Sequence, residues 1–114
     1  MGLERKAAAG VLKEIATLLE LHDENPHRVR AFANAARAVE RVEGDLEQLV
    51  GSGEIQDLKG VGKGTAGVLA ELMQQGTPEV LAELEQRTPE GVRELLQISG
   101  LGPKKTRTLW RDLD

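Results

Sequence analysis

Apolar residues recur at intervals of three, four and seven along most of the chain. Within residues 3–21 they form one stripe, made of Ala8, Val11, Leu12, Ile15, Leu18 and Leu19. Such intervals place side chains on one face of an α-helix, whereas a strand alternates at every second position. The pattern predicts an amphipathic helix over residues 3–21, and no segment has the alternation of a strand.

Cap and turn residues divide the middle of the chain into further short helices. Asn25-Pro26 predicts a helix that continues to about residue 42 and ends at Gly44, with Asn as the cap and Pro in the first turn. A short helix over 46–50 follows. Gly51-Ser52-Gly53 is expected to be a flexible joint before the next unit.

The second half of the chain also contains residues that start and end helices. Gly76 is expected to end a helix that closes at residue 75, and the final helix is predicted from Pro103 to about residue 114. Thr77-Pro78 and Thr88-Pro89 each predict a helix start, with threonine as the cap and proline in the first turn. All connections are two to five residues long, as in compact helical domains.

Residues 55–66 and 95–106 are two copies of one pattern, 40 positions apart. They read Ile-Gln-Asp-Leu-Lys-Gly-Val-Gly-Lys-Gly-Thr-Ala and Leu-Leu-Gln-Ile-Ser-Gly-Leu-Gly-Pro-Lys-Lys-Thr. Apolar residues three apart mark the end of one helix, and the glycines that follow allow a tight turn into the next. We expect the residue between the glycines, Val61 or Leu101, to fill the gap between the two helices.

The second glycine of each copy, Gly62 or Gly102, falls where a helix begins. Free N–H groups and the positive end of the helix dipole are found there, so a phosphate can approach a corner without a side chain. A Rossmann-type phosphate loop also has closely spaced glycines, but it needs a β-strand before them, and none is predicted here.

Each copy resembles the helix-hairpin-helix motif, which binds nucleic-acid backbone without reading bases. The whole order also resembles the N-terminal region of bacterial family X DNA polymerases, relatives of DNA polymerase beta. The resemblance rests on Asn-Pro-His-Arg-Val-Arg-Ala-Phe-Ala-Asn-Ala-Ala-Arg-Ala (25–38), Leu-Lys-Gly-Val-Gly-Lys-Gly (58–64), Gln-Gly-Thr-Pro (75–78) and Ile-Ser-Gly-Leu-Gly-Pro-Lys-Lys (98–105). It implies a compact all-α fold, with residues 1–76 as an 8-kDa-like domain and residues 77–114 as a second hairpin segment packed on it.

The resemblance implies a module that binds gapped, nicked or end-containing DNA independently of sequence. The expected DNA-binding residues are Gly60, Val61, Gly62, Lys63, Gly64, Thr65, Gly100, Leu101, Gly102, Lys104, Lys105, His27 and Arg28. No cofactor is required. By the same resemblance, a sodium or potassium ion is expected on backbone carbonyls at each hairpin when DNA is bound, held by Gln56, Leu58 and Val61 and by Leu96, Ile98 and Leu101.

Enzymatic activity is not expected from this chain. Polymerase chemistry in the resembled family needs aspartates of a later palm domain, and the sequence ends before a palm or a phosphoesterase domain. The position of the family's lyase lysine is Val68, and that of a supporting tyrosine is Phe32. Two alternatives stay open, a residual 5′-deoxyribose-phosphate lyase using Lys59 or Lys63, and a helical protein-interaction scaffold.

Charge and composition narrow the mode of binding. The formal net charge of −4 and the pI of about 5.3 argue against a protein that coats nucleic acid by bulk charge. The basic residues are instead clustered, as in Arg37 with Arg41 and Lys59 with Lys63. Phe32 and Trp110 are the only aromatic residues and lie on apolar helix faces, so we expect them in the core rather than stacked on bases.

Compartment and assembly follow less directly from the sequence. The chain has no cysteine and no apolar run of about 18 residues, and its N-terminus lacks the layout of a signal peptide. We expect a cytoplasmic monomer, nucleoid-associated through its function.

Overall fold

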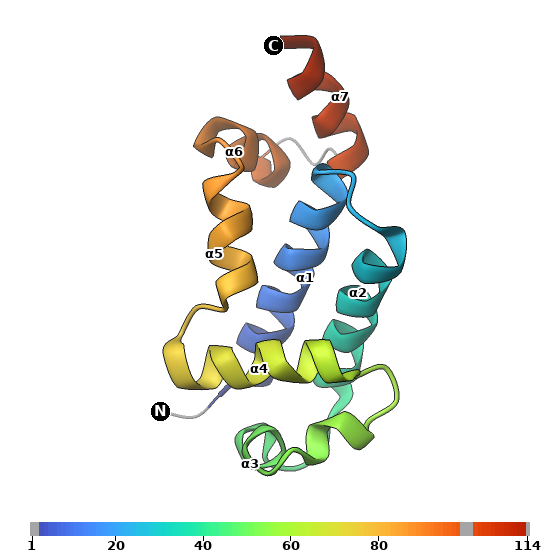
Figure 1. The fold of residues 1–114 in the computed structure, drawn as a ribbon, viewed down its shortest axis with the longest axis vertical. Helices are drawn as coiled ribbons and strands as arrows, with labels where there is room; N and C mark the ends of the chain where they lie inside the picture. The colour runs from blue at the N-terminus through green and yellow to red at the C-terminus, as the bar shows by residue number, and fades with distance from the viewer. Residues whose placement is uncertain (1–2, 99–101, 114) are drawn as a thin grey trace.

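The computed structural model describes residues 3–98 and 102–113, and within these ranges the regular structure is entirely helical (Figure 1). The elements are α1 (Arg5–Leu21), α2 (Pro26–Arg41), α3 (Leu46–Ser52), the 3₁₀ helix η1 (Glu54–Asp57), α4 (Lys63–Gln75), α5 (Glu79–Gln86), α6 (Glu90–Ile98) and α7 (Pro103–Leu113). The prediction of an all-α fold is therefore confirmed.

Helix α1 is the centre of the molecule. It packs along α2 and also contacts α5 and α7, while α4 contacts α2, α5 and η1. In Figure 1 the three C-terminal helices line one side and one end of α1, and α3 with η1 forms the opposite end of the molecule. The segment after residue 76 is thus joined to the N-terminal part through α1, whereas the division into two domains at that point stays a prediction.

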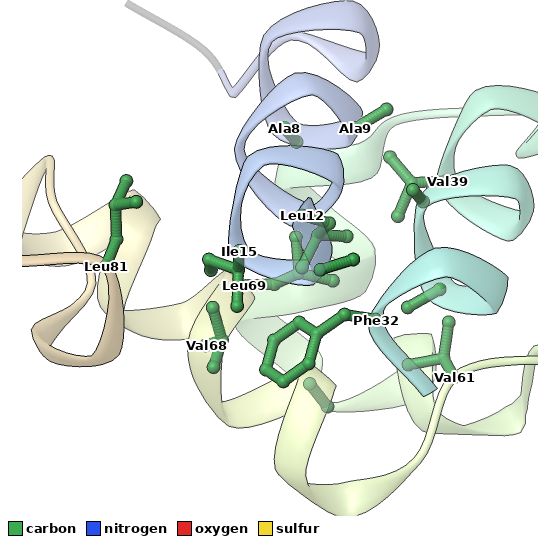
Figure 2. Packing of buried hydrophobic residues seen from close by; sticks show 14 of the residues in the cluster. Ala8, Ala9, Leu12, Ile15, Phe32, Val39, Val61, Val68, Leu69 and Leu81 are labelled. Carbon is green, nitrogen blue, oxygen red and sulfur yellow. The ribbon is translucent and has the colours of Figure 1, made fainter. Parts of the chain in front are cut away.

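The predicted stripe of the first helix forms the core. Ala8, Leu12 and Ile15 are fully buried, and Leu18 and Leu19 are nearly so. Figure 2 draws Phe32 of α2 near Leu12 and Ile15 of α1 and near Val68 and Leu69 of α4. The ring is only 5% exposed, as its place on an apolar helix face predicted. Each fully buried large side chain of this kind contributes roughly 1.5–3 kcal/mol through removal of apolar surface from water.

Two small alanines explain how α1 and α2 approach each other along their length. Ala35 and Ala36 are both fully buried on α2. A methyl side chain leaves the two backbones room to pack closely, and it loses no rotamer freedom on burial.

The start of α2 is as predicted. The Asn25 side chain accepts a hydrogen bond from the His27 N–H at 2.9 Å, and Pro26 occupies the first turn. The end of α4 is also as predicted, since Gly76 follows Gln75 with φ +86, a backbone angle that favours glycine.

The predicted threonine caps of α5 and α6 were wrong. Pro78 itself is the cap residue of α5, and its carbonyl accepts the Ala82 N–H at 3.1 Å. The Pro89 carbonyl similarly accepts the Arg93 N–H at 3.1 Å. The Thr88 hydroxyl donates to the Leu84 carbonyl at 2.7 Å, so it is directed toward the preceding helix α5.

The predicted flexible joint was also wrong. Gly51 and Ser52 belong to α3, and the Ser52 hydroxyl donates to the Leu49 carbonyl at 3.3 Å. Only Gly53 leaves the helix, with φ +85, and η1 begins directly after it. A single left-handed residue therefore redirects the chain, and α3 passes into η1 without a spacer.

Glu14 on α1 gives a testable pH dependence of stability. Burial, and the nearby Glu85 carboxylate, raise the pKa of Glu14 above its ordinary 4.5, and Arg93 opposes them. The folded state therefore holds this proton more tightly than the unfolded chain, so ionised Glu14 destabilises the fold above its folded-state pKa. That loss disappears as the pH falls towards 4.5.

We expect Glu14→Gln to raise the melting temperature at pH 7 by an amount that shrinks as the pH is lowered to 4.5. Because the side chain is partly exposed, the gain should stay below about 1 kcal/mol. Thermal melts at several pH values measure it, with the exposed Glu83→Gln on α5 as the matched control. A difference that is constant with pH would contradict the assignment.

Candidate nucleic-acid interface

The first hairpin consists of η1, a tight turn and the start of α4. The Leu58 carbonyl accepts the Val61 N–H at 3.1 Å, which closes the turn. Gly60 has φ +99, and a Cβ there would lie 3.2 Å from the Asn34 carbonyl oxygen of α2. Glycine is therefore required at this position both by the backbone angle and by close packing against α2.

Val61 anchors the turn to the core. Its side chain is 7% exposed and belongs to the main apolar cluster, together with Ile55 of η1. The apolar residue between the glycines is thus buried in the core, whereas its predicted place in the gap between the two helices stays a prediction. A buried anchor of this kind fixes the orientation of the residues that follow it.

The start of α4 presents free backbone donors to solvent. The first intrahelical bond runs from the Ala66 N–H to the Gly62 carbonyl (2.9 Å), so the N–H groups of Lys63, Gly64 and Thr65 have no intrahelical acceptor. Gly62, Lys63 and Gly64 are exposed, whereas Thr65 is buried, and no acidic residue lies in the first turn. The dipole of α4 adds positive potential at the same place.

Gly62 contributes open space to this site rather than a free N–H donor. Its N–H donates to the Thr65 hydroxyl at 3.0 Å, and that hydroxyl donates back to the Gly62 carbonyl at 3.2 Å. A Cβ at Gly62 would meet nothing within 4 Å, and neither would one at Gly64. The absence of side chains therefore leaves the free amides accessible from outside.

The second hairpin is described only on either side of its turn. Gly100 and Leu101, which the sequence placed in the DNA-binding set, lie outside the described residues. Gly102 is exposed, and its carbonyl accepts the Thr106 N–H at 3.0 Å. Pro103 has no N–H, so α7 offers fewer free amides than α4, although Lys104 and Lys105 are exposed beside them.

Acidic groups lie close to the start of α7. A cavity of about 240 Å³ brings Lys104 and Arg107 together with Glu20, Asp23 and Glu24. Arg107 Nη1 lies 2.9 Å from Asp23 Oδ1 and donates to the Glu20 carbonyl at 3.2 Å. The second hairpin is therefore the less favourable place for an anion.

The remaining predicted residues lie in different surroundings. His27 and Arg28 are exposed in the first turn of α2, where Arg30 Nη2 donates to His27 Nδ1 at 2.9 Å. Pro26 and Arg30 border the cavity that contains Lys104, so this turn is next to the second hairpin. Val68, at the position of the family's lyase lysine, is 9% exposed and belongs to the core.

The predicted carbonyl ligands of a monovalent ion stay a prediction. The Leu58 carbonyl accepts one hydrogen bond from Val61, and a carbonyl oxygen has a second lone pair that an ion can use. Among residues 3–98 and 102–113, no group of three or more His, Asp or Glu side chains is arranged to hold a metal ion.

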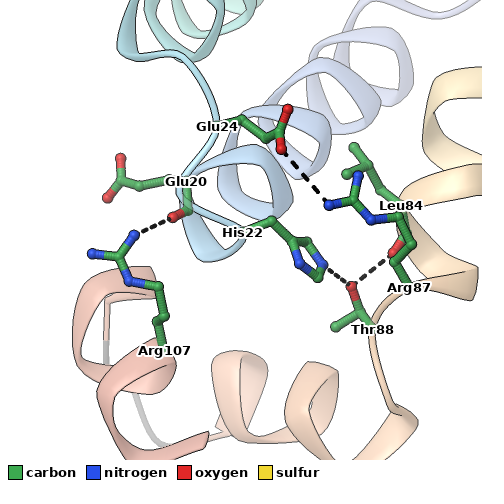
Figure 3. Close-up of polar contacts among 7 residues, drawn as sticks. All are labelled: Glu20, His22, Glu24, Leu84, Arg87, Thr88 and Arg107. Atoms are coloured by element: carbon green, nitrogen blue, oxygen red, sulfur yellow. Dashed lines mark hydrogen bonds and ion pairs between the residues drawn. The ribbon is translucent and has the colours of Figure 1, made fainter. Parts of the chain in front are cut away.

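Sequence reasoning missed a polar junction centred on His22. Figure 3 shows His22 Nε2 facing the Thr88 hydroxyl, at 2.8 Å. Because that hydroxyl donates to the Leu84 carbonyl, His22 Nε2 must be the donor. Arg87 and Glu24 form an ion pair beside it at 3.7 Å.

The His22 ring also meets Trp110 of α7 edge to face, with ring centroids 5.6 Å apart. Burial, then the charge of Arg87, lower the pKa of His22 below its ordinary 6.5. These surroundings, between the end of α1, the α5–α6 connection and α7, therefore favour the neutral form of His22. In the sequence His22 is followed by Asp23 and Glu24, and this polar segment gave no sign that His22 contacts the α5–α6 connection and α7.

Comparison with known proteins agrees with this geometry. The chain belongs to the helix-hairpin-helix domain family, whose model matches residues 4–78. Over 111 residues it is 35% identical to the DNA polymerase/3′-5′ exonuclease PolX of Bacillus subtilis (strain 168). The match covers 97% of this chain and 19% of that protein, so the chain spans about a fifth of the length of this relative.

The resemblance inferred from the sequence is therefore confirmed. The matched part is a small helix-hairpin-helix region and does not include the polymerase and exonuclease parts of the relative. In the part of the chain that the structure describes, no helix has the length and apolar character needed to span a lipid bilayer.

Proposed function

We propose that this chain is a sequence-independent DNA-binding module of the family X polymerase type, which holds phosphates on backbone amides at its two hairpins. Support comes from the family match over residues 4–78 and from the similarity to a protein named as a DNA polymerase. The module acts as a monomer on gapped, nicked or end-containing DNA.

The observation that carries the proposal is the start of α4. Three amides without an intrahelical acceptor, an exposed Lys63 and two glycines with open space lie together there, and the first turn has no carboxylate. An anion of phosphate size is the ligand that such a helix start favours. The start of α7 is the second, weaker contact in this proposal.

Recognition through phosphates also fits the aromatic residues. Phe32 is buried and Trp110 is half-buried against the core, so neither ring is free to stack on bases as rings do in single-strand-binding proteins. Contacts to phosphates carry no sequence information directly, and binding should be nearly independent of sequence. A sodium or potassium ion on the hairpin carbonyls would add a bridge to a phosphate.

The proposal is tested by fluorescence-anisotropy titration of gapped, nicked and intact duplex DNA at several salt concentrations. If two to four phosphates are contacted, the logarithm of the association constant should fall with the logarithm of salt concentration with a slope of about −2 to −4. Two sequences of equal length should bind alike. Absence of binding at low salt, or binding that does not change with salt, would reject the proposal.

A further inference from the structure

A broad groove lies beside the first hairpin and shares only the turn residues Leu58 and Gly60 with the surfaces described above. It has a volume of about 1070 Å³ and runs between α2 on one side and α3 with the hairpin turn on the other. Its charged lining residues are Arg37, Arg41, Glu43 and Lys59. Three of them are cations and one is an acid, in a protein whose formal net charge is −4.

The cations of the groove come from both of its walls. Arg37 and Arg41 are one helical turn apart on α2, and both are exposed. Arg37 Nη1 donates to the Asn34 side chain at 3.2 Å, which orients its guanidinium along the helix. Lys59 reaches the groove from the opposite wall, in the turn that Gly60 holds against α2.

The floor of the groove is apolar. Val42 is buried, and Ala38, Leu49 and Leu58 are half-buried beneath the cations. Among the described residues, no ion pair involves Arg37, Arg41 or Lys59, whereas the neighbouring Glu40 is paired with Lys13 at 2.6 Å. A positive groove suits the backbone of an unpaired nucleic-acid strand, and because none of its lining residues is aromatic, phosphates rather than stacked bases would provide the contacts.

We infer that this groove binds a single DNA strand that continues from the phosphate site at the start of α4. The inference rests on the proposed function. Gly60 lines the groove and Gly62 opens α4, so their Cα atoms are at most roughly 7 Å apart. The groove and the phosphate site are therefore close enough for one strand to contact both. The groove would therefore favour gapped over nicked duplex, because only a gap exposes an unpaired strand.

The test replaces one cation from each wall, as Arg41→Gln and Lys59→Gln, and compares them with Arg87→Gln. Arg87 is exposed on the α5–α6 connection and lies outside the groove, and its replacement removes the same charge. Thermal melts establish that all three proteins are folded. Anisotropy titrations then use three probes, which are gapped duplex, nicked duplex and an acidic poly-glutamate peptide.

We expect Arg41→Gln and Lys59→Gln each to weaken binding to gapped duplex roughly threefold to fivefold, and to reduce its salt slope by about 0.7. Binding to nicked duplex should change less than twofold, and Arg87→Gln should match wild type on both DNA probes.

If the wild type binds DNA but the groove variants match Arg87→Gln, the groove assignment fails while the proposed function stands. If the wild type binds the peptide and the groove variants lose only that binding, the groove is a protein-docking site and the inference is overturned. If the wild type binds no DNA, both proposals fall.

Discussion

Gly62→Val should remove most of the DNA binding and leave the protein folded. Gly62 has φ −103 and ψ −179, an extended conformation that valine adopts readily, and a Cβ there meets nothing within 4 Å. The isopropyl group would, however, stand beside the free amides of Lys63 and Gly64, where a phosphate oxygen must come within hydrogen-bonding distance. We expect at least about a tenfold loss of affinity, which corresponds to about 1.4 kcal/mol.

The matched control is Gly67→Val. Gly67 lies on the same helix, is exposed and has the same open space around its Cβ position, but it is beyond the first turn. Titration of gapped duplex measures the affinity of each variant, and a thermal melt establishes that each variant is folded. Gly102→Val should weaken binding less than Gly62→Val, because Pro103 removes one donor and acids border the start of α7. Wild-type affinity in a folded Gly62→Val protein would rule out phosphate binding by these amides.

Gly60→Ala should be the most damaging glycine substitution for stability. An L-residue at φ +99 is strained, and the new Cβ would lie 3.2 Å from the backbone oxygen of Asn34, which cannot move without shifting α2. We expect a loss of about 2–3 kcal/mol in the free energy of unfolding. Since a domain of this size is stable by only about 5–15 kcal/mol, the shift in a denaturant melt should be large.

Gly44→Ala separates the two causes of that loss. Gly44 has φ +91, so the backbone strain is similar, but a Cβ there meets nothing within 4 Å. Its loss should be about 1–2 kcal/mol, and the remainder measured at Gly60 then reports the contact with α2. A Gly60→Ala protein that unfolds at the wild-type denaturant concentration would show that the turn is not held as described.

What the sequence predicted well depends on local chemistry. The stripe of α1, the Asn25 cap and the Gly76 stop all follow from residues within one or two turns of each other. The same is true of the start of α4, because free amides and a missing side chain are properties of the helix end itself. These features needed no knowledge of the rest of the fold.

What the sequence predicted poorly depends on contacts between distant segments. Thr88 was expected to cap a helix. Its hydroxyl instead donates a hydrogen bond to the Leu84 carbonyl and accepts one from His22, which is 66 positions away in the sequence. The acids beside the start of α7 come from the end of α1 and the loop after it. Neither arrangement leaves a trace in local periodicity, so the acidic surroundings of the second hairpin were not visible in its glycine pattern.

The groove beside the first hairpin could be predicted only in part from the sequence. The sequence showed Arg37 with Arg41 and Lys59 with Lys63 as separate basic pairs, but helical spacing alone could join only the first pair. Gly60 brings the two segments together by packing its backbone on α2. A close approach between backbones depends on tertiary structure, and a glycine in a sequence does not say which helix it will touch.

Because Trp110 contacts His22 edge to face, the fluorescence of this tryptophan can report on the packing of α7. Trp110 is the single tryptophan of the chain, and it rests against α1 from the last helix. Its fluorescence emission therefore reports whether the C-terminal segment is seated on α1, without any added label. Detachment of that segment during titration with DNA, acid or denaturant can be followed separately from the melting of the rest of the helical core.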